Sequence, residues 1–242
     1  MSPHLTGQAV EKSTSLTRSP LAKSVSGPHA WGDAKVSLHA VSGERKYLNR
    51  DEWRRALHAM RRLEPRRSLY ARLLAWTGAR PSEVLSLSAS SFDIEAGTVN
   101  IVTLKRRAHA VRGVPIPPEL MAALVRQFDL RRLQREALTA ARRLFTWSRV
   151  TAWRIIKKVM ALAAITGIRA CPKGFRHAFG VGALQSGVPL TLVQRWMGHA
   201  RLATTAIYLN VSGPDELVFA RWFWNGVRKP TPSPVFSYAM AA

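Results

Sequence analysis

The sequence predicts a mainly α-helical fold with one small antiparallel β-sheet, an α+β class. Three observations support this prediction. Apolar residues recur at helical spacing along most of the chain from residue 47 onward. Short runs typical of β-strands occur close together between residues 92 and 115. Proline and glycine residues separate these segments at positions where helices begin and end.

Composition indicates a DNA- or RNA-associated protein. The 242 residues are 47% hydrophobic, which is enough for one substantial core. Lys and Arg total 37 against 14 Asp and Glu, a net charge of +23. This excess favours a polyanionic partner, with nucleic acid first and an anionic membrane surface second. Cys171 is the only cysteine, which excludes an intrachain disulfide and a thiolate metal cage.

The chain divides into three predicted parts. Residues 1–46 are rich in Ser, Gly, Pro and Thr and are expected to form a mostly flexible basic arm. Residues 47–228 are expected to form one domain, and residues 229–242, which contain several prolines, a flexible tail. We find no signal peptide and no apolar run long enough to span a membrane, so we expect a cytoplasmic, nucleoid-associated protein.

The first helices have clear local signals. Asn49 is expected to cap a helix, with Glu52 completing a capping box. Pro65 interrupts the apolar pattern, and a more apolar segment then runs to Gly78. Pro81 suits the first turn of a third helix.

The central segment is expected to contain the sheet. Residues 92–94, 98–103 and 110–115 are the predicted strands, with Lys105 near a hairpin tip. A helix should follow from Pro117 and Pro118.

The remaining segments are again predicted to be helical. Residues 129–143 form an arginine-rich helical connection, and Ser148 caps a long helix to about Ala164 whose apolar face includes Val150 and Trp153. Helices are also expected over 173–185, 189–196, 202–209 and 215–224.

Cations from separate segments, followed by an isolated tyrosine, favour phosphoryl transfer onto a phenol. A free phenol has a pKa of about 10, so nearby cations must favour the phenolate or take its proton. Guanidinium groups match the oxygens of a phosphate with paired donors, and two of them could replace a metal ion. A lysine whose pKa is lowered by neighbouring charge could protonate the leaving alkoxide.

The motifs resemble those of the tyrosine recombinases, or integrases, from about Tyr47 to Val211. They are Thr-Gly-Ala-Arg80-Pro-Ser-Glu83, Lys173-Gly-Phe-Arg176-His177, Met-Gly-His199, and Tyr208 nine residues after that histidine. Each motif alone is weak, but their order and spacing together are specific. The resemblance implies the catalytic-domain fold of that family, with Arg80, Lys105, Lys173, Arg176, His199 and Tyr208 as the active residues.

The resemblance also implies a mechanism. Arg80 and Arg176 would hold the scissile phosphate of double-stranded DNA while Tyr208 attacks it and forms a 3′-phosphotyrosyl link. Lys105 would protonate the leaving 5′-oxygen, and His199 and Lys173 would hold the phosphate. Neither a metal nor another cofactor is implied, and the substrate complex would be a homotetramer on two DNA sites.

Several positions differ from the family pattern or are given no catalytic role by it. Lys173 occurs where many relatives have histidine, which leaves a histidine-mediated proton transfer there open. We set His177 aside as a structural histidine and expect Glu83 to pair with a nearby cation. Relatives usually have a helical DNA-binding domain before the catalytic one, so either this enzyme grips DNA from one side or an accessory protein supplies the missing half of the clamp. The apolar segment 217–224 could dock on a neighbouring protomer or on its own core.

Three alternatives stay open. A type IB topoisomerase-like enzyme would share the arginines, the lysine and the tyrosine, and would relax supercoils without a specific sequence. A non-catalytic DNA-binding protein with the same fold would form no covalent adduct. The third alternative is an RNA-binding protein, but we recognise no aromatic stacking motif for it.

Overall fold

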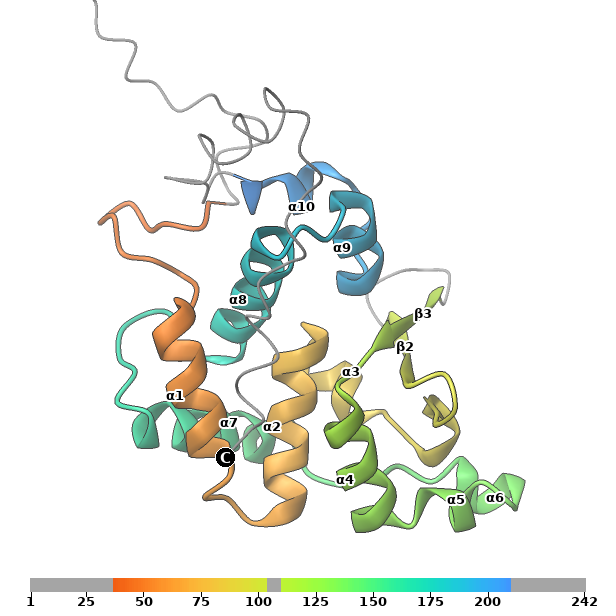
Figure 1. Ribbon diagram of the computed structural model, residues 1–242. Helices are drawn as coiled ribbons and strands as arrows, with labels where there is room; N and C mark the ends of the chain where they lie inside the picture. Colours follow the sequence, from red (N-terminus) through yellow and green to blue (C-terminus); the bar gives the residue numbers. More distant parts are fainter. Residues whose placement is uncertain (1–36, 104–109, 210–242) are drawn as a thin grey trace, which may run out of the picture. The chain divides into compact units, whose positions relative to one another are not determined.

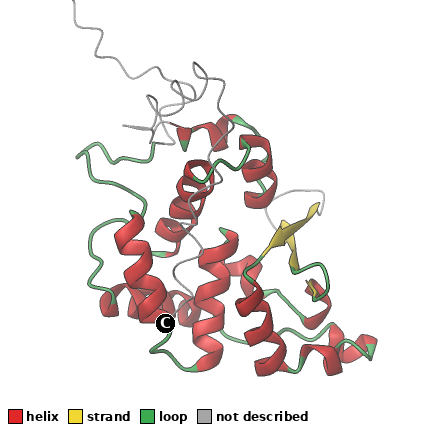
Figure 2. Ribbon diagram, viewed as in Figure 1, coloured by secondary structure: helices red, strands yellow, loops and turns green. Residues whose placement is uncertain are grey.

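The computed structural model describes residues 37–103 and 110–209. Lys105, the predicted segment 215–224 and the predicted tail at 229–242 lie outside the described residues, as does most of the predicted arm. The described residues form helices and one small sheet, which confirms the predicted fold class (Figures 1 and 2). The helices are α1 (Arg50–Met60), α2 (Pro65–Thr77), α3 (Pro81–Leu85), α4 (Pro118–Phe128), α5 (Leu130–Leu133), α6 (Ala137–Ala140), α7 (Arg149–Leu162), α8 (Pro172–Gln185), α9 (Leu190–Met197) and α10 (Ala203–Ala206), with a 3₁₀ turn at Ala89–Ser91.

The predicted helix ends at Asn49, Gly78 and Ser148 are confirmed. The backbone N–H of Glu52 donates to Asn49 Oδ1 at 2.8 Å, and Glu52 returns the bond to the Asn49 N–H at 2.9 Å. Ser148 Oγ accepts the Thr151 N–H at 3.1 Å at the start of α7. Gly78 ends α2 in the left-handed region, with φ of 59°. These signals act within a few residues of one another, which is why sequence alone located them.

Helix α2 lies at the centre of the main core. Its residues from Leu69 to Thr77 are buried except for Arg72, so it is covered on nearly every side. It packs against α1, α3, α4, α7 and α8. A helix that is apolar around most of its circumference is expected to be enclosed by other elements.

The sheet has three antiparallel strands in the order β1 (Phe92–Asp93), β2 (Thr98–Thr103) and β3 (Ala110–Pro115). Thr98 pairs with Pro115 and Thr103 with Ala110. Alternate residues of β3 face the interior, namely Arg112 and Val114. The inward face of this sheet therefore includes an arginine. Helix α9 contacts β3, so the sheet borders the C-terminal part of the described fold.

Two predictions need correction. The apolar face of α7 is narrower than expected, because Val150 and Trp153 are 57% and 49% exposed. Ile155, Ile156, Val159 and Met160 fill the space against the core, and the two outer residues lie beside that face. Trp153 instead contacts Lys157, whose Nζ lies 5.7 Å from its ring centroid.

The second correction concerns the predicted arm, whose last residues are packed rather than free. Leu38 is buried in a small core with Tyr47, and His39 bridges Arg45 across a turn. Arg45 Nη1 also lies 3.2 Å from Glu52 Oε2. Structure therefore begins before residue 47.

Candidate active site

Arg80 is held at the start of α3 by its own neighbour in the motif. Its backbone N–H donates to Glu83 Oε2 at 2.9 Å, and its Nη1 donates to Glu83 Oε1 at 2.8 Å. The preceding Gly78 must be glycine, because a Cβ there would lie 2.5 Å from the Phe179 ring and its φ is positive. Arg80 remains 24% exposed, so its guanidinium is accessible from outside.

A buried ion pair supports this arrangement. Glu83 is fully buried and also accepts a bond from Arg112 Nη2 at 2.7 Å. Burial alone would raise the pKa of Glu83, but the charge of Arg112 and the bonds from Arg80 and Arg112 hold it below its usual value. The expected pairing of Glu83 with a cation is confirmed. Sequence reasoning missed Arg112, although it shares the inward face of β3 with Val114.

Arg112 extends the contact to two further elements. Its Nη1 donates to Thr103 Oγ1 at 2.8 Å, and its Nε donates to the Trp196 carbonyl at 2.7 Å. The arginine therefore joins α3, β2 and the end of α9. An open pocket of about 240 Å³ lies beside it, bordered by Arg112, Arg195 and His199.

Arg176 joins the two turns that carry Arg80 and His199. From α8 it donates Nη1 to the Gly78 carbonyl and Nη2 to the Met197 carbonyl, the latter at 2.6 Å. Burial, reinforced by the charge of Arg80, lowers the pKa of Arg176 to about 10. The guanidinium stays protonated at neutral pH.

His199 is buried directly after α9. Gly198 precedes it with φ of 64°, and a Cβ there would meet Arg112 at 3.1 Å. His199 Nδ1 lies 2.9 Å from Thr205 Oγ1. Burial, with the charges of Arg176 and Arg80, lowers the pKa of His199 to about 3, so the ring is neutral.

Tyr208 lies two residues beyond α10 rather than on the predicted helix over 202–209. Its side chain points inward and the residue is only 3% exposed. Its ring stacks on His199, with centroids 6.3 Å apart, and fills the space beside Gly180, where a Cβ would lie 2.7 Å away. Burial raises the pKa of Tyr208 to about 12, although the charges of Arg176 and Arg80 act in the opposite direction.

The hydroxyl of Tyr208 contacts a histidine that we had set aside. Its Oη lies 3.2 Å from Nδ1 of His177, which is buried on α8. Gly180 follows His177 by three residues on the same helix. Both residues contact Tyr208, and spacing along the chain does not reveal this, because it depends on how α8 packs against the residues after α10.

The structure therefore brings together Arg80, Arg176, His199 and Tyr208. Lys173 is exposed one turn before Arg176 and His177, and no hydrogen bond to its side chain is found among the described residues. Its charge still acts on His177. Two guanidiniums beside a phenol form a group suited to the charge of a phosphodiester.

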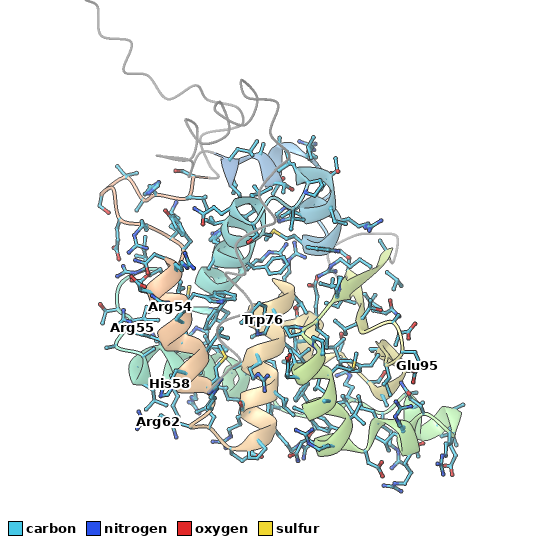
Figure 3. The ribbon with its side chains drawn as sticks, in the orientation of Figure 1. Arg54, Arg55, His58, Arg62, Trp76 and Glu95 are labelled. Carbon is cyan, nitrogen blue, oxygen red and sulfur yellow. The ribbon has the colours of Figure 1, made fainter. Side chains whose placement is uncertain are left out.

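The described residues have further features outside this group. Arg54, Arg55 and His58 project from α1 and Arg62 from the turn that follows it, and all four are exposed (Figure 3). In the described part of the chain, His, Cys, Asp and Glu side chains form no group of three able to bind a metal ion. Across residues 37–103 and 110–209, no helix has the length and hydropathy to cross a bilayer.

Comparison with known proteins gives consistent matches. The model of the phage integrase family matches residues 46–213. Tyrosine recombinase XerD of Haemophilus ducreyi is 31% identical over 156 residues, covering 62% of this chain and 52% of the relative. Tyrosine recombinase XerA of Thermococcus onnurineus is 31% identical over 170 residues, covering 69% and 58%. The chain spans about half the length of these curated relatives.

Solved structures show the same fold. The crystal structure of a XerA recombinase aligns with a TM-score of 0.59 at 26% identity, covering 75% of this chain and 65% of that one. The catalytic domain of bacteriophage HP1 integrase aligns with a TM-score of 0.55 at 22% identity, covering 74% and 95%.

Proposed function

The chain belongs to the phage integrase family, and from this premise we propose that it is a tyrosine-type, site-specific DNA recombinase. It cuts and rejoins double-stranded DNA through a covalent 3′-phosphotyrosyl link at Tyr208. The observation that carries the proposal is the convergence on one phenol: the charges of Arg176 and Arg80 both act on Tyr208, and its ring stacks on His199.

In the proposed reaction, Arg80 and Arg176 hold the scissile phosphate and stabilise the charge that develops on its oxygens. Tyr208 Oη forms a bond to phosphorus as the bond to the 5′-oxygen breaks. Lys105 supplies the proton for that oxygen, and His199 and Lys173 hold the phosphate. The phosphotyrosyl link conserves the bond energy, so rejoining to another strand needs no ATP.

The inward position of Tyr208 has a consequence for this reaction. A phenol that is 3% exposed cannot reach a phosphate on a DNA duplex. We therefore infer that the residues around α10 open on DNA binding and admit the scissile phosphate to Oη, which keeps its contact with His177 Nδ1.

The proposal also covers the domain bounds, the oligomeric state and the cellular location of the enzyme. The catalytic domain runs to residue 228 and includes the packed residues that precede Tyr47, and the enzyme works as a homotetramer on paired DNA sites. The enzyme acts in the cytoplasm with the nucleoid, in integration, excision or resolution of a mobile element.

Covalent capture tests the proposal. Nicked duplexes of random sequence are incubated with the protein, and adducts that survive denaturation are isolated and sequenced. Wild type and Tyr47→Phe, a matched change in the same small core, should form adducts, whereas Tyr208→Phe should form none. Arg80→Ala should slow adduct formation by about 10³–10⁵-fold. Adducts from Tyr208→Phe, or none from wild type, would contradict the proposal. Relaxation of supercoils without sequence preference would favour the topoisomerase-like alternative.

A further inference from the structure

The reaction requires a group that removes the proton of the Tyr208 hydroxyl. At neutral pH a phenol whose pKa is about 12 is almost wholly protonated. The acceptor must have a free lone pair within hydrogen-bonding distance of Oη. His177 Nδ1 meets the distance requirement at 3.2 Å.

The other site residues are poorer acceptors. Arg80 and Arg176 have no lone pair to offer, and a protonated lysine such as Lys173 only donates. His199 Nδ1 is engaged with Thr205 Oγ1 at 2.9 Å, and no bond from His199 to the Tyr208 hydroxyl is found among the described residues.

The second ring nitrogen of His177, Nε2, can carry the ring proton while Nδ1 accepts from Tyr208. Nε2 is buried and has no hydrogen-bond partner among the described residues. With Tyr208 donating to Nδ1, the ring proton resides on Nε2, and Nδ1 keeps the lone pair that attack requires. His177 was not among the predicted catalytic residues.

We propose that His177 is the general base that activates Tyr208. This inference rests on the proposed function. As Oη bonds to phosphorus, its proton passes to Nδ1 and His177 becomes an imidazolium. The electron pair of the breaking P–O bond leaves with the 5′-oxygen, which takes its proton from Lys105. In the rejoining step the 5′-hydroxyl attacks and gives its proton back to Lys105, while Nδ1 returns its proton to the departing phenolate.

The surrounding charges suit a base that is neutral at rest. Lys173 and Arg176 on α8 and Lys46 on the N-terminal segment face His177, together with the uncharged Tyr208 and His199. Burial, reinforced by those three cations, lowers the pKa of His177 to about 4, so the lone pair is free at pH 7. A bound phosphodiester adds negative charge beside the same cations and makes proton uptake more favourable.

A measurement without DNA tests the resting geometry. ¹⁵N-histidine NMR reports which ring nitrogen carries the proton. We expect His177 protonated at Nε2, with an Nδ1 resonance that moves in Tyr208→Phe. A proton on Nδ1 would make His177 the donor and would overturn the proposal, whatever the DNA experiments show.

Single-turnover cleavage tests the catalytic role. His177→Asn keeps an acceptor near the Nδ1 position but cannot take a proton. It should slow adduct formation about 10²–10⁴-fold, while His39→Asn leaves the rate unchanged. The defect should persist on DNA with a 5′-bridging sulfur, a leaving group that needs no acid. A wild-type rate in His177→Asn, or its recovery on the sulfur substrate, would overturn the role.

Two controls separate the possible failures. Thermal unfolding checks that His177→Asn folds, and if it does not, the tautomer in wild type decides alone. Absence of adducts with wild-type protein would contradict the proposed function rather than the assignment of His177.

Discussion

The two hydrophobic cores of this protein differ in size and in what they hold. The main core surrounds α2 and contains interlocking rings such as Trp53 with Trp76 and Tyr70 with Phe145. The small core consists of Leu38, Tyr47, Phe179, Val181, Ala183, Val193, Met197, Ile207 and Tyr208. Glu83, which holds Arg80, is packed into the first region, and the proposed nucleophile belongs to the second. The carboxylate that holds Arg80 is thus beside the larger core, and the proposed nucleophile is packed in the smaller one.

Helix α8 connects the two cores. Phe175 belongs to the main core, Phe179 and Val181 belong to the small one, and Arg176 lies between them. A shift of the small core can therefore admit the phosphate to Tyr208 while α8 keeps Arg176 and His177 in place.

The largest expected effect is on the ion pair beside the main core. Arg112→Met leaves the Glu83 charge buried without its closest partner and should lower the free energy of unfolding by about 3–5 kcal/mol. Urea denaturation measures this free energy. Arg131→Met, which removes an exposed pair with Glu95, should change it by about 0–1 kcal/mol. Equal changes in the free energy of unfolding for the two variants would show that the buried Arg112–Glu83 pair does not stabilise the fold.

A matched pair of methionines compares the cores directly, because Met60 in the main core and Met197 in the small core are both fully buried. Met60→Ala should lower global stability by about 2–5 kcal/mol. Met197→Ala should instead speed amide exchange in α9 and α10 while α2 stays protected. Loss of α2 protection in both variants would mean that the cores unfold as one unit.

Overpacking the Tyr208 ring should loosen only the small core. Gly180→Ala places a Cβ 2.7 Å from the ring, and such crowding usually costs about 1–3 kcal/mol. With the phenol displaced toward solvent, its pKa should fall from about 12 toward 10, as followed by ultraviolet titration. Gly113→Ala, where the nearest atom is 3.4 Å away, is the control and should leave that titration unchanged.

The smallest effect, taken per pH unit, is a pH dependence that arises from two buried histidines. Their pKa values are lowered to about 4 for His177 and about 3 for His199, against 6.5 unfolded. The unfolded chain binds more protons below pH 6.5, so stability is full above that pH and falls as pH drops. Each ring contributes at most about 1.4 kcal/mol per pH unit. His177→Asn should reduce the slope between pH 6.5 and 4, and an unchanged slope would contradict the burial of a neutral ring.

The features predictable from sequence were those that depend on neighbours along the chain. The Asn49 capping box, the Gly78 and Gly198 turns and the strand bounds needed only local spacing. The Arg112–Glu83 and His177–Tyr208 contacts join residues 29 and 31 positions apart, and depend on how the elements pack. The sequence predicted Trp153 on the buried face of α7, whereas it is half-exposed. Helical spacing alone does not distinguish an apolar residue at the edge of a buried face from one within that face.

The contacts of Arg176 also affect how relatives of this chain should be interpreted. Because its guanidinium fastens the carbonyls of Gly78 and Met197, a descendant that had lost all activity would still need an arginine there to hold its shape. Retention of that residue is thus a poor marker of a working enzyme. Decay of the reaction during evolution should show first at Tyr208 or Arg80.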